Sequence, residues 1–482
     1  MQFFITQHIL GLLLMIFSIT LLPPILMAWW LHEPTIDAFL TAFSLTLLTG
    51  FIFWLPTRNI NGDLRLRDGF IIVVMFWLVL GLFGAIPFIL TDSPQLSVTD
   101  SIFESLSGLT TTGATVITHL ENLPRSILYY RQQLQWFGGM GIIVLAVAIL
   151  PILGIGGMQL YRAETPGPVK DSKITPRITE TAKALWMIYC LLTLLCAASY
   201  WLAGMNLFDA VGHSFSTIAI GGFSTHNASL GYFHSPMINA IAIIFMLIAG
   251  INFSLHFVAW RSFSLKNYWR DTEVKAFFLI LTLISLIVSS YLYFNQIYSG
   301  PESIMYGVFQ TVSIGTTSGF AIVDYSLWPG FLPVILLFSS FIGGCAGSTG
   351  GGMKVIRFVL LFKQGLREIT QLIHPNAKIV VKLGGKPVPE RIITSVWGFF
   401  SLYVASFSIM MLALMMTGLD QISAFSAMAA CMNNLGPGMG DVSITYSQLN
   451  DPAKWILSFA MLLGRLEIFT LLVLFSRTFW RN

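Results

Sequence analysis

The stretch Glu104–Val116, ESLSGLTTTGATV, determines the interpretation of the whole chain, because a version of it occurs four times. Each version is a short, mildly polar run that ends in a glycine and lies between two long apolar segments. An acidic residue lies 13–17 positions before each of these glycines. Four such loops in equivalent settings predict a ring around one axis, which is how a pore is built. The other three versions are HSFSTIAIGGFST at His213–Thr225, FQTVSIGTTSGFA at Phe309–Ala321 and MAACMNNLGPGMG at Met428–Gly440.

The composition indicates a membrane protein. Of the 482 residues, 55% are hydrophobic and only 10% are charged, and the mean hydropathy is +0.76. Soluble domains carry about 25% charged residues. Apolar runs of about 20 residues, enough to cross a bilayer as a helix, recur along the whole length. The predicted fold class is therefore an all-α polytopic membrane protein.

The first apolar run is predicted to be a retained helix. No basic segment precedes it, and it is longer than the apolar core of a signal peptide. The four cysteines lie in apolar or glycine-rich stretches without the spacing of metal ligands. We expect them to be buried small side chains rather than disulfides or zinc ligands: Cys190, Cys196, Cys345 and Cys431.

The apolar runs divide the chain into two leading transmembrane helices and four repeats of helix, pore loop and helix around one central pore. The leading helices fall within residues 1–56, and the repeats occupy residues 70–158, 181–260, 274–365 and 390–482. Ten spans are predicted, at residues 8–30, 36–55, 70–90, 132–153, 184–203, 237–258, 276–294, 331–361, 392–416 and 455–475.

The charges fix the expected orientation of these spans. With this division, 22 of the 26 basic residues fall in segments on one side of the membrane, of which the longest polar loop is Lys354–Arg391. Basic residues mark the cytoplasmic side, so both termini are predicted to be cytoplasmic and the four loops to enter from the outside. The outer side then carries twelve acidic residues against three basic ones, a field that would concentrate cations at the mouth.

The four glycine-ended loops are predicted to form a selectivity filter. Non-helical backbone is tolerated at membrane depth only where it is buried in protein or lines a watery cavity. Glycine permits backbone angles that other residues avoid, and rings of carbonyl oxygens can replace the hydration shell of a cation. The residues predicted to contact the metal ion are Thr110, Thr111, Thr112, Gly113, Ile220, Gly221, Gly222, Thr317, Ser318, Gly319, Asn434, Leu435 and Gly436.

Each loop is preceded by an expected short helix whose partly negative C-terminal end would favour a cation in the cavity. The upstream acids then lie near the helix N-termini, where carboxylates cap free amides. Helix capping and direct ion binding both suit these acids, and capping is the favoured interpretation. The four acids are Asp100, Asp209, Glu302 and Asp420.

The run FIGGCAGSTGGGMK at Phe341–Lys354 is predicted to break the inner helix of the third repeat. Six glycines in ten residues cost roughly 1 kcal/mol each in a helix relative to alanine. A non-helical segment below the filter would plug the cavity and act as a gate. Close helix packing through small residues is the alternative, and a phosphate-binding loop is disfavoured because the GxxxxGK[ST] spacing is absent. The predicted gate glycines are Gly343, Gly344, Gly347, Gly350, Gly351 and Gly352.

Two charged residues stand inside the last predicted span. Arg465 and Glu467 lie between apolar residues, where charges are costly and usually face a cavity or a partner. Two positions apart on a helix, they would project to different sides. We expect Arg465 to face the pore under the filter and to hydrogen-bond the glycine-rich loop. Glu467 is expected to balance charge or to pack at a helix contact.

Several motifs resemble the TrkH/TrkG potassium-uptake subunits of bacteria and, more distantly, KtrB and the plant HKT transporters. They include GLTTTGAT, QWFGGMGIIVLAVAILP, GGMQLYRAE, IGGFSTH, FIGGCAGSTGGGMKVIR, NNLGPG and GRLEIFTLLVLF. The resemblance covers essentially the whole chain. It implies a homodimer in the bacterial cytoplasmic (inner) membrane with one pore per subunit, an intramembrane gating loop, and potassium selectivity where each filter segment has a glycine. It also implies a cytoplasmic regulatory ring of TrkA, which binds NAD and adenine nucleotides.

The function predicted is potassium-selective uptake, with potassium as the transported ion and no organic cofactor. The alternative is a cation symporter that couples potassium to protons or sodium. Few acidic residues lie in the spans, which argues against an acid-based relay but leaves backbone ion sites open. A non-conducting assembly subunit would not need four intact glycine loops. The chain lacks the motifs of an enzyme, and no nucleic-acid partner is expected. The basic cytoplasmic face suits lipid headgroups or a protein partner.

Overall fold

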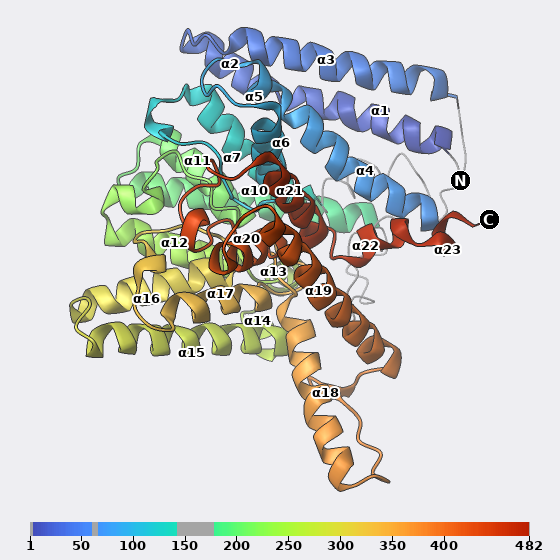
Figure 1. Ribbon diagram of the computed structural model, residues 1–482, viewed down its shortest axis with the longest axis vertical. Helices are drawn as coiled ribbons and strands as arrows, with labels where there is room; N and C mark the ends of the chain where they lie inside the picture. The colour runs from blue at the N-terminus through green and yellow to red at the C-terminus, as the bar shows by residue number, and fades with distance from the viewer. Residues whose placement is uncertain (1–2, 60–65, 142–177, 482) are drawn as a thin grey trace.

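The computed structural model describes residues 3–59, 66–141 and 178–481, and these residues are arranged almost entirely as helices (Figure 1). In this described part, the strands are limited to one short antiparallel hairpin, β1 at Lys382–Leu383 and β2 at Lys386–Pro387. The all-α fold class is confirmed. Three of the four cysteines are buried and Cys190 is partly exposed, and all four are free.

Two leading helical segments pack against each other before the repeats begin. They are α1 at Phe3–Ile19 with α2 at Leu22–Trp30, and α3 at Ile36–Trp54. A Cβ atom built on Gly11 of α1 would lie 2.8 Å from the carbonyl oxygen of Gly50 of α3, and one on Gly50 would lie 2.9 Å from that of Gly11. Small residues on both sides therefore let the two backbones touch, as at many membrane helix contacts.

The rest of the chain follows one order four times: a long outer helix, a short buried helix and an inner helical segment. The outer helices are α4 with α5 (Leu66–Gly84, Ile86–Leu90), α10 (Ile178–Leu202), α15 (Thr272–Phe294) and α19 (Glu390–Met416). The short helices are α6 (Val98–Leu109), α11 (Leu207–Ala219), α16 (Gly300–Gly315) and α20 (Gln421–Met432). The inner segments are α7 (Arg125–Gly139), α12 with α13 (Pro236–Ala249, Phe253–Ser262), α17 with α18 (Leu332–Ile342, Val355–Ile373) and α21 with α22 (Asp451–Arg465, Phe469–Leu472).

Six helices in the described residues are long and apolar enough to cross a membrane, and two bent pairs bring the count to eight. The remaining predicted spans are the inner segments of the first and third repeats. The predicted span 132–153 continues past residue 141, outside the described residues, and the third inner segment is interrupted as predicted between α17 and α18. Most of the basic segment 161–183 also lies outside the described residues. The apolar helices make the protein an integral membrane protein.

Two predicted continuous spans are wrong, because the inner segments of the second and fourth repeats are also broken. The chain bends by 93° between α12 and α13 and by 109° between α21 and the residues from Phe469 to Phe475. In the first bend, the Asn252 side chain caps α13 by accepting a 2.8 Å hydrogen bond from the Ser254 amide. In the second, Glu467 and Ile468 have φ angles of 52° and 60°, which helices do not allow. Neither break carries the glycine cluster that marks the third.

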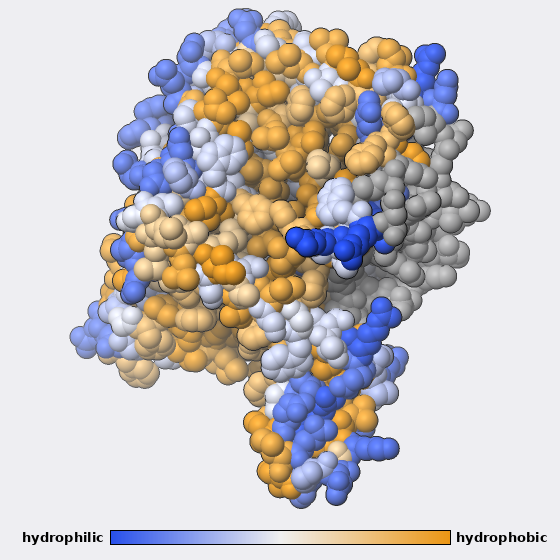
Figure 2. All heavy atoms as spheres, turned by 45° about the vertical axis from the view of Figure 1, so that its right-hand side comes forward, coloured by the Kyte–Doolittle hydropathy of each residue, from blue (hydrophilic) through white to orange (hydrophobic). Residues whose placement is uncertain are grey.

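The prediction of a long polar loop at Lys354–Arg391 is also wrong for most of its length. Helix α18 fills residues 355–373, and the β1–β2 hairpin and short turns follow. This helix is strongly amphipathic, so its charges lie on one face and do not prevent helix formation. Helix α18 extends away from the body of the molecule (Figure 1). The short C-terminal helix α23 (Arg477–Trp480) lies on the same side of the molecule as the start of α1. On the face shown in Figure 2, apolar residues cover much of the body, hydrophilic residues gather at its edge, and the α18 extension carries residues of both kinds.

Candidate functional site

The four short helices begin at the acidic residues noted in the sequence. Asp100, Asp209 and Glu302 are each the third residue of their helix, and Asp420 is the N-cap of α20, where it accepts a 2.9 Å hydrogen bond from the Ile422 amide. Hydrogen bonds from Ser299 hold the pKa of Glu302 below its ordinary value. All four acids therefore lie at the favourable end of a helix dipole. Glu302 and Asp420 accept backbone amides as expected. The capping expected of Asp100 and Asp209 is wrong, because Ser97 and Asn206 are the N-caps of α6 and α11.

Each short helix ends in the same unusual backbone turn. The glycine of the loop has a positive φ, and so does the residue two positions before it. A side chain makes the left-handed region costly, so a non-glycine residue there is held by its surroundings. The φ angles of these pairs are 57° and 81° for Thr111 and Gly113, 55° and 78° for Ile220 and Gly222, 70° and 78° for Thr317 and Gly319, and 54° and 96° for Asn434 and Gly436.

These four turns form a closed ring. A Cβ atom built on Gly113 would lie 2.0 Å from the carbonyl oxygen of Gly221 in the second repeat. Cβ atoms built in the same way on Gly222, Gly319 and Gly436 would lie close to the carbonyl oxygens of Ser318, Leu435 and Thr112, at 2.1, 2.1 and 2.7 Å, respectively. Every glycine thus abuts the carbonyl before the glycine of the next repeat, and the fourth returns to the first. We call residues 110–113, 220–222, 316–319 and 434–436 the ring segments.

Most polar side chains of the ring segments are buried and bonded to one another. The hydroxyls of Thr110 and Thr112 are 2.8 Å apart, and those of Thr316 and Ser318 are 3.0 Å apart. The Asn434 amide donates to the Thr112 hydroxyl at 3.0 Å and so joins the fourth segment to the first. Because these side chains are used inside the protein, the backbone is the group that the ring can offer to an ion.

Each ring segment is also tied to the short helix that precedes it. Glu104, His213 and Gln310 each lie nine residues before the glycine of their own segment. Each contacts the chain just after that glycine: Glu104 accepts from the Val116 amide, His213 lies 2.9 Å from the Ser224 hydroxyl, and Gln310 donates to the Val323 carbonyl. In the fourth repeat, Ser426 bonds both the amide and the carbonyl of Met439. The turns are therefore held from behind by the helix ends.

The glycine-rich break lies directly against the ring segments. The Gly351 amide donates to the Thr317 hydroxyl at 2.7 Å, and the Gly352 amide donates to the Asn433 carbonyl at 3.0 Å. The Thr349 hydroxyl donates to the Ile218 carbonyl at the end of α11, at 2.9 Å. Glycines are required here, because a Cβ atom on Gly351 would lie 1.9 Å from the Asn433 oxygen. The predicted non-helical segment is present and contacts three of the four repeats.

Arg465 joins this break to the first repeat. Its guanidinium donates to the Thr349 carbonyl and to the Thr111 hydroxyl, both at 3.3 Å, and to the Gly138 carbonyl. It also lies over the Trp77 ring, 5.2 Å from the centroid. The expected hydrogen bond between Arg465 and the glycine-rich loop is therefore present.

The expectation that Arg465 and Glu467 share one helix is wrong. Helix α21 ends at Arg465, and Glu467 lies in the bend that follows. Its carboxylate forms an ion pair with Arg357 of α18, and the Arg357 guanidinium lies over the Phe399 ring. Glu467 therefore balances a specific charge and links the breaks of the third and fourth repeats.

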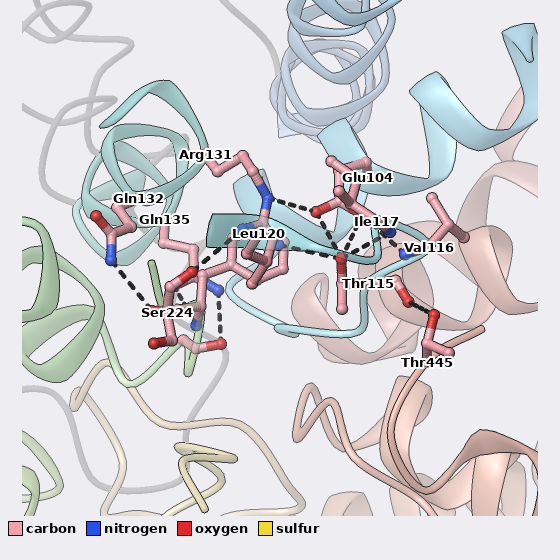
Figure 3. A network of polar contacts seen from close by, with 12 residues as sticks. Glu104, Thr115, Val116, Ile117, Leu120, Arg131, Gln132, Gln135, Ser224 and Thr445 are labelled. Atoms are coloured by element: carbon pink, nitrogen blue, oxygen red, sulfur yellow. Dashed lines mark hydrogen bonds and ion pairs between the residues drawn. The ribbon is translucent and has the colours of Figure 1, made fainter. Parts of the chain in front are cut away.

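A buried network near the first ring segment was not identified as a site from the sequence. Arg131 of α7 donates to the Glu104 carboxylate at 2.8 Å, and their side chains are 1% and 0% exposed (Figure 3). Arg131 also donates to the Thr115 hydroxyl and to the Ser224 carbonyl of the second repeat, at 3.1 and 3.2 Å. Thr445 of the fourth repeat donates to the Thr115 carbonyl. The signal in the sequence was the polar run from Arg131 to Gln135 at the start of a predicted span.

Each of the four repeats contributes one glycine turn, and the four turns close a ring. This arrangement defines the class of protein: an integral membrane protein with one fourfold pseudosymmetric site. The family model TrkH, described as a cation transport protein, matches residues 35–481. The chain is 57% identical to the Trk system potassium uptake protein TrkH of Vibrio parahaemolyticus and 56% identical to that of Escherichia coli K12, with all of each chain covered. It is 43% identical to the E. coli TrkG protein, with 99% of each chain covered.

A solved structure agrees with these similarities. The crystal structure of the potassium transporter TrkH from Vibrio parahaemolyticus superposes with a TM-score of 0.92 at 55% identity, and all of both chains is covered. The chain therefore belongs to the TrkH family of cation transport proteins. This membership confirms the predicted family and the prediction that the chain is a transport protein and not an enzyme.

Proposed function

We propose that this protein takes up potassium across the bacterial cytoplasmic membrane through the four ring segments. The observation that carries the proposal is the cyclic contact of each ring glycine with a carbonyl of the next repeat. Such a ring offers backbone oxygens in place of an ion's hydration shell, and the C-terminal ends of four short helices favour a cation beside it. The relatives named as potassium uptake proteins support potassium as the ion.

The glycine-rich break and Arg465 form the proposed gate. The break lies against the ring segments and accepts a hydrogen bond from Arg465, so its movement breaks hydrogen bonds such as those to Thr317 and Asn433 but unwinds no helix. The positive charge of Arg465 opposes the passage of a cation while it stays in place. Opening is assigned to a cytoplasmic ring of the TrkA type that binds NAD and adenine nucleotides. The protein acts as a homodimer with both termini in the cytoplasm.

Ion flux into liposomes that hold the purified protein tests the proposal. Potassium, rubidium and sodium are compared for the native chain and for Gly113→Ser. The proposal expects potassium and rubidium to pass, sodium to be resisted, and the serine variant to lose this discrimination. Flux that appears only after a TrkA-type partner is added would also support the ring and would mean that the gate is closed in isolation.

Two results would contradict this mechanism. Equal passage of sodium and potassium, unchanged by Gly113→Ser, would remove the selectivity claim. Potassium flux that depends on a proton or sodium gradient across the liposome membrane would favour the symporter instead.

A further inference from the structure

The second ring segment differs from the other three in the way it is held. Its residues Ile220, Gly221 and Gly222 carry no polar side chain, whereas the first and third segments have hydroxyl pairs and the fourth has the Asn434 amide. Two consecutive glycines also give this segment the greatest backbone freedom. Its carbonyl oxygens therefore need support from elsewhere in the protein.

A glutamine from the neighbouring repeat supplies that support. Gln135 of α7 donates from Nε2 to the Gly221 carbonyl at 2.5 Å, and its Oε1 accepts a 3.0 Å hydrogen bond from the Phe223 amide. The two bonds span Gly222, and the Gln135 side chain is fully buried. The Gly221 oxygen held in this way is the same atom that abuts Gly113. Gln135 thus fixes the contact between the first and second ring segments.

Two neighbours on α7 extend this hold along the second segment. Gln132 donates to the Phe223 carbonyl at 3.4 Å, and Arg131 donates to the Ser224 carbonyl at 3.2 Å while its guanidinium lies 4.2 Å from the centroid of the Phe223 ring. Figure 3 shows Arg131, Gln132 and Gln135 extending from α7 toward this stretch of chain. Residues 221–224 are therefore positioned by a helix of the first repeat.

We propose that Gln135 is a positioning residue for ion discrimination, because it sets the direction of the Gly221 carbonyl in the ring. This inference rests on the proposed function of the ring. Gln135 has no need to contact the ion. Its two hydrogen bonds keep one of the ring carbonyls at a fixed distance from the axis, and without them the two glycines can turn that carbonyl away. A smaller cation with a different preferred distance is then no longer rejected as strongly.

The test compares Gln135→Met with Gln133→Met in liposome flux assays with rubidium and sodium. Methionine keeps the length of glutamine but makes neither amide hydrogen bond. Gln133 is a matched control, because it lies on the same helix, is 3% exposed and uses its amide to donate to the Thr20 carbonyl, away from the ring. Gln135→Asn is a second variant, since it keeps the amide but is one methylene too short to make both bonds.

We expect the ratio of rubidium to sodium flux to fall by about fivefold or more in both Gln135 variants, because each loses a hydrogen bond that fixes a charge-binding group. In Gln133→Met the ratio should stay unchanged. Ratios at the native value in folded, conducting Gln135 variants would overturn the inference. So would failure of both variants to fold while Gln133→Met folds, because the role of Gln135 would then be structural. If the native protein itself does not discriminate, the proposed function fails instead, so the two failures can be told apart.

Discussion

Alanine substitutions at the four ring glycines should show whether ion selectivity depends on the contacts between ring segments or only on backbone strain. Each variant adds one methyl group next to the carbonyl of the following repeat. The structure predicts a strong effect for Gly113→Ala, Gly222→Ala and Gly319→Ala, and a weaker one for Gly436→Ala. This order follows from distances, because the four positions have similar sequence settings and similar φ angles.

The size of each effect follows from how far a carbonyl must move. Cβ atoms essentially never approach a heavy atom closer than 3.0 Å, so the Gly221 oxygen, 2.0 Å from the Cβ position of Gly113, must shift by 3.0 − 2.0 = 1.0 Å. The Thr112 oxygen, 2.7 Å from that of Gly436, needs only 3.0 − 2.7 = 0.3 Å. Misplacing a carbonyl that contacts a charge costs roughly 1.5–3 kcal/mol, or about 10- to 150-fold in the ratio of rubidium to sodium flux, in which rubidium replaces potassium. For Gly436→Ala, where the carbonyl shift is small, we expect the same flux ratio to change by less than about fivefold.

The assay measures rubidium and sodium uptake into liposomes and takes their ratio, which cancels differences in the amount of reconstituted protein. Gly418→Ala is the matched control. Gly418 has a φ of +103° with no atom within 4 Å of its Cβ position, so alanine there meets backbone strain at least as large, roughly 1–3 kcal/mol, without a clash. We expect Gly418→Ala to lower stability and to leave the ratio unchanged.

Two outcomes would refute this reasoning. A ratio in Gly418→Ala as low as in Gly113→Ala would mean that strain alone explains the loss. A larger effect at Gly436 than at Gly113 would mean that the cyclic contacts do not set selectivity.

Two further predictions concern charged residues close to the ring segments. Arg465→Ala should raise potassium flux in correctly folded protein, because it removes the hydrogen bond to the Thr349 carbonyl and a positive charge near the ring; unchanged or abolished flux would argue against a gating role. Glu104→Gln should lower the free energy of unfolding in detergent by roughly 3–5 kcal/mol, because it leaves the buried Arg131 charge unpaired. The exposed Asp324→Asn is its control, and equal melting temperatures for the two variants would show that the buried pair contributes nothing.

The sequence was sufficient for the class, the repeats and the place of the third break. Long apolar runs need a bilayer whatever their packing, and six glycines in ten residues disfavour a helix in any context. The acids before each loop also marked helix starts, since a carboxylate near free amides acts locally. The breaks after α12 and at Glu467 were not predictable in this way, because both occur in stretches that suit a continuous helix. Each is stabilised by partners far away in the chain: the first by hydrogen bonds with Cys345 and Gly347, the second by the ion pair with Arg357.

The sequence by itself therefore determined what depends on near neighbours and on composition: a membrane protein, four glycine-ended turns and one glycine-rich break. Only the tertiary structure decided which atoms meet. The contact of Gly113 with the Gly221 carbonyl, the hold of Gln135 on that carbonyl, and the pairing of Glu467 with Arg357 join residues that are far apart in the chain. The physical reason is that hydrogen bonds and steric contacts act over a few ångströms in space, and spacing along the chain does not specify them until the helices are packed.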